Sequence, residues 1–80
     1  MLIYNNDNYK VFNTDHISMI DLEYNEEVHK KTGSDVWDVV VYDVKGNKHL
    51  VKRFWQKEPC AVMYNFKCAI HDGEKSFKFG

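Results

Sequence analysis

The segment VWDVVVYDV, residues 36–44, constrains the fold more than any other part of the chain, because β-branched and aromatic residues of this kind favour strands. Its apolar side chains fall on both faces of the predicted strand, as Val39 and Val40 illustrate. Such a strand is expected in the centre of a sheet, or in a place where both of its faces are covered. The Lys-Gly-Asn turn at 45–47 then predicts a hairpin whose second strand is 48–55.

Other segments predict further extended structure around this hairpin. Residues 18–24 alternate apolar and polar side chains, which is typical of a strand with one buried face. Residues 2–12 contain two short extended pieces around an Asn-Asp turn at 5–8, and alternating phenylalanines at 76–79 indicate a final strand or a docking arm. The polar segment 25–35 predicts a loop that is long enough to contact a partner.

Residues 59–73 have the signals of a helix with few charges. Pro59 suits a first helical turn, and Gly73 suits a C-terminal stop. Placing successive residues about 100° apart gives a core stripe of Val62, Met63, Phe66, Ala69 and Ile70. The opposite side is largely uncharged, and its candidate partner-binding residues are Cys60, Tyr64, Lys67, Cys68 and His71.

Two interpretations of this uncharged side of the helix remain open. The N-terminal segment or the 76–79 tail could fold over it. Alternatively, it could be a contact surface for a protein partner or for a second copy of the chain, which would form a homodimer. The contact surface is the functional interpretation we favour, because neutral tyrosine, cysteine and alanine side chains pack easily.

The size and composition of the chain predict one compact unit. Eighty residues with 44% hydrophobic and 15% aromatic side chains are enough for one core, and they argue against disorder. We therefore expect residues 1–80 to form a single α+β domain. Its predicted architecture is an antiparallel sheet of about four strands, with one C-terminal helix packed on one face, in two layers.

The charges are divided unevenly along the chain, although the net charge is only −1. Residues 1–44 carry nine acids and three bases, whereas residues 45–80 carry eight bases and three acids. The acids that could contact a partner are Asp21, Glu23, Glu26 and Glu27. The basic, aromatic segment 48–57 offers an alternative nucleic-acid surface, in which cations meet phosphates and an aromatic ring stacks on a base. Its candidate residues are Lys48, Lys52, Arg53, Trp55 and Lys57.

The sequence gives little support for catalysis, a metal or a membrane span. Cys68 and His71 could form a nucleophile–base pair or chelate one ion, but no third orienting group or set of four zinc ligands accompanies them. We expect no enzymatic activity, metal or cofactor. No stretch approaches the roughly 20 apolar residues of a membrane helix, and the start of the chain does not resemble a secretory signal. Cys60 lies eight residues from Cys68, about 12 Å along a helix, so we expect reduced thiols and a cytoplasmic protein.

The order VFNTDHISMIDLEY, then VWDVVVYDVKGNKHLVKRF, then a C-terminal helix resembles the layout of small proteins from phages and mobile elements of low-GC bacteria. Anti-CRISPR inhibitors are among those proteins. The resemblance implies a non-enzymatic protein-binding module that binds one partner and blocks it. A small nucleic-acid-binding protein that uses the 48–57 segment is the alternative.

Overall fold

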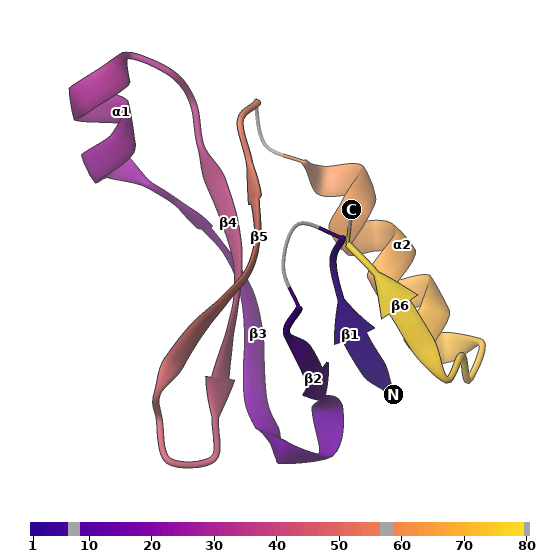
Figure 1. The fold of residues 1–80 in the computed structure, drawn as a ribbon. Coiled ribbons are helices and arrows are strands. Elements are labelled where there is room, and N and C mark those ends of the chain that lie inside the picture. Colours follow the sequence, from indigo (N-terminus) through magenta and orange to yellow (C-terminus); the bar gives the residue numbers. More distant parts are fainter. Residues whose placement is uncertain (7–8, 57–58, 80) are drawn as a thin grey trace.

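The structure, a computed structural model, describes residues 1–6, 9–56 and 59–79 of the chain, and it is α+β. As the two-sided apolar pattern predicts, β4 (Trp37–Asp43) is the central strand of a sheet. The strands β3 (Ile17–Tyr24) and β5 (Lys48–Phe54) lie antiparallel on either side of it, and we call these three strands the large sheet (Figure 1). The predicted hairpin and the predicted half-buried strand are therefore confirmed.

A second sheet corrects the prediction of a single sheet of about four strands. It contains β1 (Leu2–Tyr4), β2 (Val11–Asn13) and β6 (Ser76–Lys78) in the order β2-β1-β6. We call it the small sheet. The 76–79 tail forms a strand parallel to β1, and the Tyr4 carbonyl accepts the Phe79 backbone N–H at 2.8 Å. The predicted Asn-Asp turn lies partly at residues 7 and 8, outside the described residues.

A short helix replaces the loop that was predicted at 25–35. This helix, α1 (Glu26–Thr32), begins after Asn25, whose side chain accepts the Val28 backbone N–H at 3.1 Å. Acidic residues occupy its first turn and basic residues its last, which suits the helix dipole. Its C-cap is Gly33, which has a left-handed φ of 73°. The prediction weighed the polarity of the segment and overlooked these capping signals.

The predicted C-terminal helix is confirmed as α2 (Cys60–His71), whose C-cap, Asp72, is followed by the left-handed Gly73. A single 3₁₀ turn, η1 (Thr14–His16), connects β2 to β3 and is capped by Asn13. Figure 1 places α1 at one end of the large sheet and α2 beside the small sheet, well apart from α1. No helix formed by the described residues is long and apolar enough to cross a membrane.

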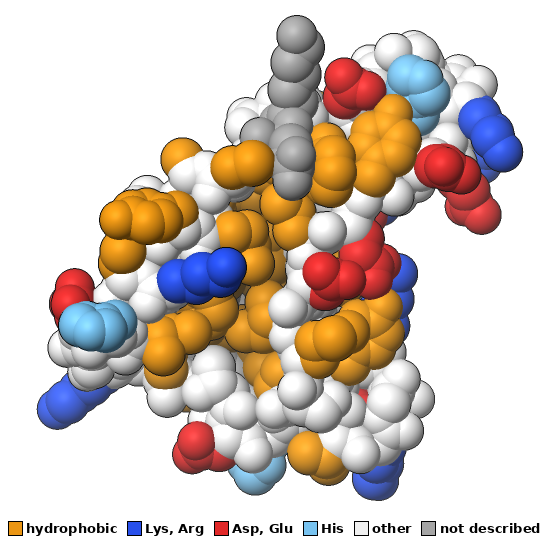
Figure 2. All heavy atoms as spheres, turned by 180° about the vertical axis from the view of Figure 1, so that it is seen from behind, with side chains coloured by type: hydrophobic (Ala, Val, Ile, Leu, Met, Phe, Trp, Pro, Cys, Tyr) orange, Lys and Arg blue, Asp and Glu red, His pale blue; other side chains and the backbone are white. Residues whose placement is uncertain are grey.

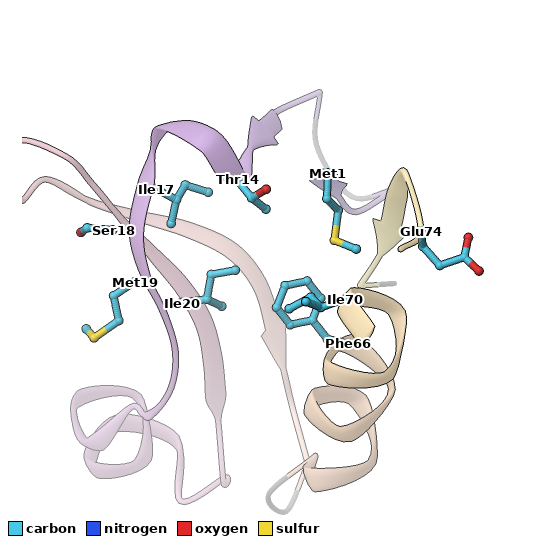
Figure 3. A pocket seen from close by; sticks show the side chains of 9 residues that line it. All are labelled: Met1, Thr14, Ile17, Ser18, Met19, Ile20, Phe66, Ile70 and Glu74. Carbon is cyan, nitrogen blue, oxygen red and sulfur yellow. The ribbon is translucent and has the colours of Figure 1, made fainter. Parts of the chain in front are cut away.

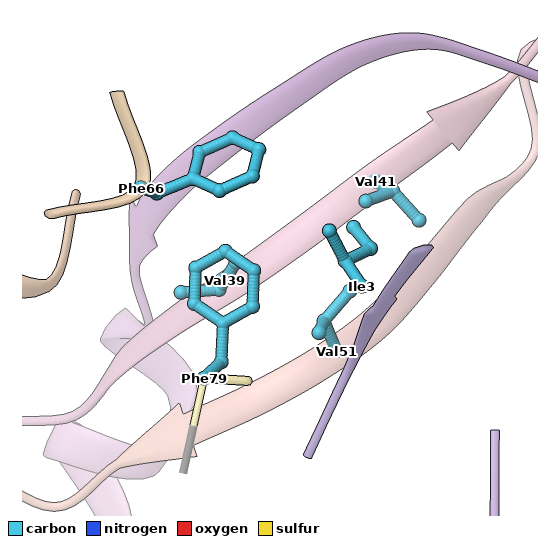
Figure 4. Close-up of a cluster of buried hydrophobic side chains, with 6 residues drawn as sticks. All are labelled: Ile3, Val39, Val41, Val51, Phe66 and Phe79. Atoms are coloured by element: carbon cyan, nitrogen blue, oxygen red, sulfur yellow. The ribbon is translucent and has the colours of Figure 1, made fainter. Parts of the chain in front are cut away.

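The core lies where the large sheet meets α2 and the small sheet. Its buried side chains come from both sheets, from α2 and from the residue after β6 (Figure 4): Ile3, Val39, Val41, Val51, Phe66 and Phe79. The rings of Phe66, Phe77 and Phe79 contact one another, with centroids 4.9 to 5.3 Å apart. Ile70, which the sequence places in the core stripe of α2, is exposed instead. The helix is turned so that Phe66 and Ala69 are its buried residues.

A candidate protein-binding groove between α2 and β3

The strand β3 is an edge of the large sheet, and among the described residues no strand pairs with its outer side. The opposite edge strand, β5, is approached by the small sheet. The Asn5 side-chain amide donates to the Val51 carbonyl, and the Phe12 ring lies 5.9 Å from the His49 ring. Among the described residues neither edge of the large sheet has a partner strand, but residues from the N-terminal part of the chain contact the β5 edge.

The backbone of β3 presents hydrogen-bonding groups along this edge. The Asn25 N–H donates to the Val36 carbonyl at 2.9 Å, so the odd-numbered residues of the strand bond to β4. The N–H and C=O groups of Ile20 and Leu22 consequently point outward in the plane of the sheet, away from β4. The Leu22 N–H donates to the Asp21 carboxylate at 2.9 Å, which confirms its outward direction.

An apolar groove runs between this edge and α2. Figure 2 shows hydrophobic side chains gathered in a furrow between α2 and the large sheet, on the side of the molecule opposite to the view of Figure 1. Two adjoining hollows of about 360 and 420 Å³ make up the groove, and Ile20 lines both. We call it the α2–β3 groove; its main residues are Ile17, Ile20, Asp21, Leu22, Cys60, Met63, Tyr64, Phe66, Lys67 and Ile70. In Figure 3, Ile17 and Ile20 extend from β3 toward Phe66 and Ile70 of α2.

Four of the predicted partner-binding residues meet at this groove. Cys60, Tyr64 and Lys67 of α2 line the same hollow as Asp21 of β3. Tyr64 is 68% exposed. The uncharged side of α2 therefore has an open part, as the contact-surface interpretation requires.

The other predicted α2 residues lie elsewhere. Cys68 is half-buried and shares a shallow pocket with Tyr4 and Phe77, on the flank of α2 that faces the small sheet. The alternative in which the chain covers its own helix thus applies to this flank. His71 is exposed at the end of α2, with its Nδ1 3.5 Å from the Asp72 carboxylate.

The predicted acidic residues divide between two places. Glu23 accepts the Tyr42 hydroxyl at 2.6 Å and forms an ion pair with Lys48 at 2.5 Å. These two hydrogen bonds lower the pKa of Glu23, the Lys48 bond having the larger effect. Glu26 and Glu27 are exposed in the first turn of α1 and line a polar pocket of about 450 Å³ with Glu23. Only Asp21 of this set lines the α2–β3 groove.

The basic candidates for nucleic-acid binding are largely occupied by contacts within the chain. Lys48 is paired with Glu23, and the Arg53 guanidinium donates to both oxygens of Asp38 at 2.9 and 3.2 Å. This bidentate bond raises the pKa of Arg53. Lys52 lies over the Phe54 ring, 5.8 Å from its centroid, while Trp55 is exposed and Lys57 lies outside the described residues. Two of the cations that would meet phosphates are therefore already neutralised.

Most of the apolar residues that line the groove also pack on the core, as the sequence predicted, and the sequence did not indicate that they would border a hollow as well. Ile20, Leu22, Met63 and Phe66 were predicted to face the core, and Ile70 was placed with them. Amphipathic periodicity identifies an apolar face, and it carries no signal for a gap left between two such faces.

Among the described residues, no group of three or more histidine, cysteine, aspartate or glutamate side chains is placed to hold a metal ion. No protein-family model, curated protein or solved structure matches the chain. Inferences about function therefore depend on the geometry of the chain itself.

Proposed function

We propose that the protein is a non-enzymatic protein-binding module, and that its partner docks in the α2–β3 groove. The observation that carries this proposal is the groove itself, which is apolar, open and bordered by the unpaired edge of β3. Apolar surface gathered in one continuous hollow is typical of interaction sites, whereas apolar side chains scattered singly over a surface are not.

Two features of the groove support a protein rather than a small ligand as its occupant. Its rim carries Tyr64 and Ile70, two large side chains that are more than half exposed, and Met63 lines its α2 wall. Tyrosine and methionine are enriched in the centres of protein interfaces, where they contribute contact area with few charges to desolvate. Asp21 of β3 and Lys67 of α2 border the same hollow and give it a polar margin.

In this proposal the module acts by occupying a surface that its partner needs, as the layout resemblance to phage-encoded inhibitors implies. An inhibitor of this kind requires no catalytic group of its own. The functional consequence would be the loss of the partner's activity at stoichiometric amounts of the module.

The test uses the tagged full-length chain to capture a partner from host-cell extract, with quantification by mass spectrometry. Tyr64→Glu places a charge in the groove and is expected to reduce recovery of the partner at least tenfold. Val44→Glu is the matched control, because it makes the same apolar-to-acidic change at a 71% exposed position on the β4–β5 turn. Recovery that is equal from all three proteins, or that is lost in both variants, would contradict a groove-bound partner.

Salt dependence separates this proposal from nucleic-acid binding. Binding in an apolar groove should persist in 0.5 M salt and lose only the part contributed by a screened charge such as Asp21, whereas binding through several phosphate contacts weakens steeply as salt rises. Charge reversal at Lys52 should likewise leave a groove-bound partner in place. Binding that disappears with salt and with the Lys52→Glu substitution would favour the nucleic-acid alternative.

A further inference from the structure

We infer that the occupant of the α2–β3 groove is an extended segment of another protein, which adds to β3 as a fourth strand and alternates apolar residues with lysine or arginine. This inference rests on the proposed function and specifies the chemistry of the partner. It follows from three properties of β3: its unpaired backbone, the direction of its side chains, and the charge of Asp21.

The backbone of β3 offers a template for an incoming strand. The N–H and C=O groups of Ile20 and Leu22 point outward from the large sheet, beside the groove. Strand addition uses such groups for main-chain hydrogen bonds, while pockets for alternate side chains give specificity. The Leu22 N–H is held by the Asp21 carboxylate, and an incoming carbonyl would take over that bond.

The two faces of the added strand would meet different surroundings. On the groove face, alternate side chains would lie beside Ile20 and Leu22 and against Met63 and Tyr64 of α2. The two hollows there, of about 360 and 420 Å³, adjoin along the strand. This face of the occupant therefore has to be apolar.

On the opposite face, the added strand would lie beside Asp21. Asp21 and Glu23 alternate with Ile20 and Leu22 along β3 and so belong to that face, although Asp21, at the edge of the sheet, also borders the hollow beside α2. Glu23 is already paired with Lys48. Among the described residues, Asp21 has no ion pair, and its described bond is to the Leu22 N–H. A lysine or arginine directly across from it would supply the missing opposite charge, because cross-strand pairs of opposite charge are favourable.

The same charges disfavour a second copy of this chain as the occupant. Antiparallel pairing of two β3 strands centred on Asp21 or Leu22 would place Asp21 opposite Asp21 or Glu23 of the second copy, and like charges in that position repel. A centre at Ile20 would bring the irregularity between Ile17 and Met19 into the new ladder. The edge is therefore suited to a basic segment of a different protein.

The test uses the full chain and an array of seven-residue synthetic peptides, with lysine or arginine at odd positions and an apolar residue at even positions. Glutamate replaces the basic residues in the matched set. The basic peptides are expected to bind at least about tenfold more tightly than the acidic set in 0.15 M salt. Asp21→Lys should reverse this order, and Glu27→Lys, which makes the same charge change on α1, should leave it intact.

Backbone methylation of the tightest peptide tests the strand itself. N-methyl groups on the amides that face β3 should each weaken binding by roughly tenfold, and those on the alternate amides by less than about threefold. Hydrogen exchange should slow at the Ile20 and Leu22 amides in the complex. The inference is overturned if no peptide binds at 1 mM, or if the loss of affinity on methylation does not alternate from one amide to the next. It is also overturned if the chain itself self-associates through these amides.

These outcomes are separable from the test of the proposed function. Suppose that the partner is lost on Tyr64→Glu but that methylation of alternate peptide amides has equal effects. This result would support the groove as the docking site and overturn strand addition. Equal capture by wild type and Tyr64→Glu would instead contradict the groove as the docking site.

Discussion

The Leu22 backbone N–H, on the unpaired edge of β3, donates to the carboxylate of the preceding residue, Asp21, at 2.9 Å. An acid in this position occupies one donor of the edge and adds charge to it. Both effects discourage unwanted pairing with other strands, which is the usual hazard of an exposed edge. Asp21 therefore has two expected roles, as a guard of the edge and as the recognition charge for a basic segment.

Replacing Asp21 by valine should make the chain self-associate. The substitution removes the repulsion between two β3 strands, releases the Leu22 N–H and raises the strand propensity of the edge. Light scattering at increasing concentration is expected to give a rising mass for Asp21→Val. The wild type and Asp15→Val, which removes an exposed acid outside β3, should hold the mass of one chain. A variant that stays at that mass at millimolar concentration would show that Asp21 does not guard the edge.

Neighbouring aromatic residues of α2 should respond differently to truncation. Phe66 is buried against Phe77 and Phe79, so Phe66→Ala should lower the free energy of unfolding by about 3–5 kcal/mol. Tyr64 lies on the groove rim, and Tyr64→Ala should change the free energy of unfolding by less than about 0.5 kcal/mol. Urea unfolding followed by tryptophan fluorescence measures both. A large cost at Tyr64 would mean that this residue is committed to the fold rather than available to a partner.

The two ion pairs of the large sheet should differ in their contribution to stability. Arg53 donates two hydrogen bonds to Asp38, whose side chain is 12% exposed, so Arg53→Ala should cost about 2 kcal/mol by leaving that carboxylate poorly paired. Lys48 is half-exposed in its pair with Glu23, and Lys48→Ala should cost less than about 1 kcal/mol. Urea unfolding measures both costs. Equal costs, or a larger cost for Lys48→Ala, would contradict the conclusion that the Arg53–Asp38 pair contributes more to stability.

Stability at low pH should depend on Asp43, at the start of the β4–β5 turn. The hydrogen bond from His49, with further ones from the Asn47 and Lys45 backbone amides, lowers the pKa of this carboxyl from 3.8 to about 2. Because the folded-state pKa is depressed, the stabilisation is present above the ordinary value of 3.8 and is lost as the pH falls toward 2.

Thermal unfolding between pH 5 and pH 2 measures this dependence. The unfolding temperature of the wild type is expected to fall across this range more steeply than that of Asp43→Asn. Asp15→Asn is the control, because its described hydrogen bond uses the backbone N–H and not the carboxylate, and it should follow the wild type. Identical slopes for the wild type and Asp43→Asn would exclude Asp43 as the source of the acid sensitivity.

The parts of the fold that were predicted from sequence are those with strong local periodicity. The two-sided apolar pattern around Val39 and Val40 identified the central strand, and the helical stripe that includes Phe66 identified α2. The division into two sheets was not predictable in this way. It depends on residues 76–79 pairing with residues 2–4, a contact between the two ends of the chain for which the sequence carries no periodic signal.

The candidate site was predictable only in part, for a related reason. Periodicity identified Tyr64 and Cys68 on one uncharged side of α2, and the structure separates them: Tyr64 faces the groove, while Cys68 faces the small sheet. The rotation of α2 about its axis and its distance from β3 are set by tertiary packing, chiefly at Phe66. The groove exists because of that placement. Since periodicity does not report how a helix is placed, the sequence could assign the apolar groove residues only to the core.

Site-specific photocrosslinking tests the central claim, that a partner occupies the α2–β3 groove, most directly. A photoreactive phenylalanine analogue at Ile70, in the groove, is compared with the same analogue at Val44, on the β4–β5 turn; the two positions are 55% and 71% exposed. Irradiation in host-cell extract should produce one discrete crosslinked protein from position 70, and it should yield none from position 44. Crosslinks of equal yield at both positions, or a crosslink at position 70 to a second copy of the chain alone, would contradict the account.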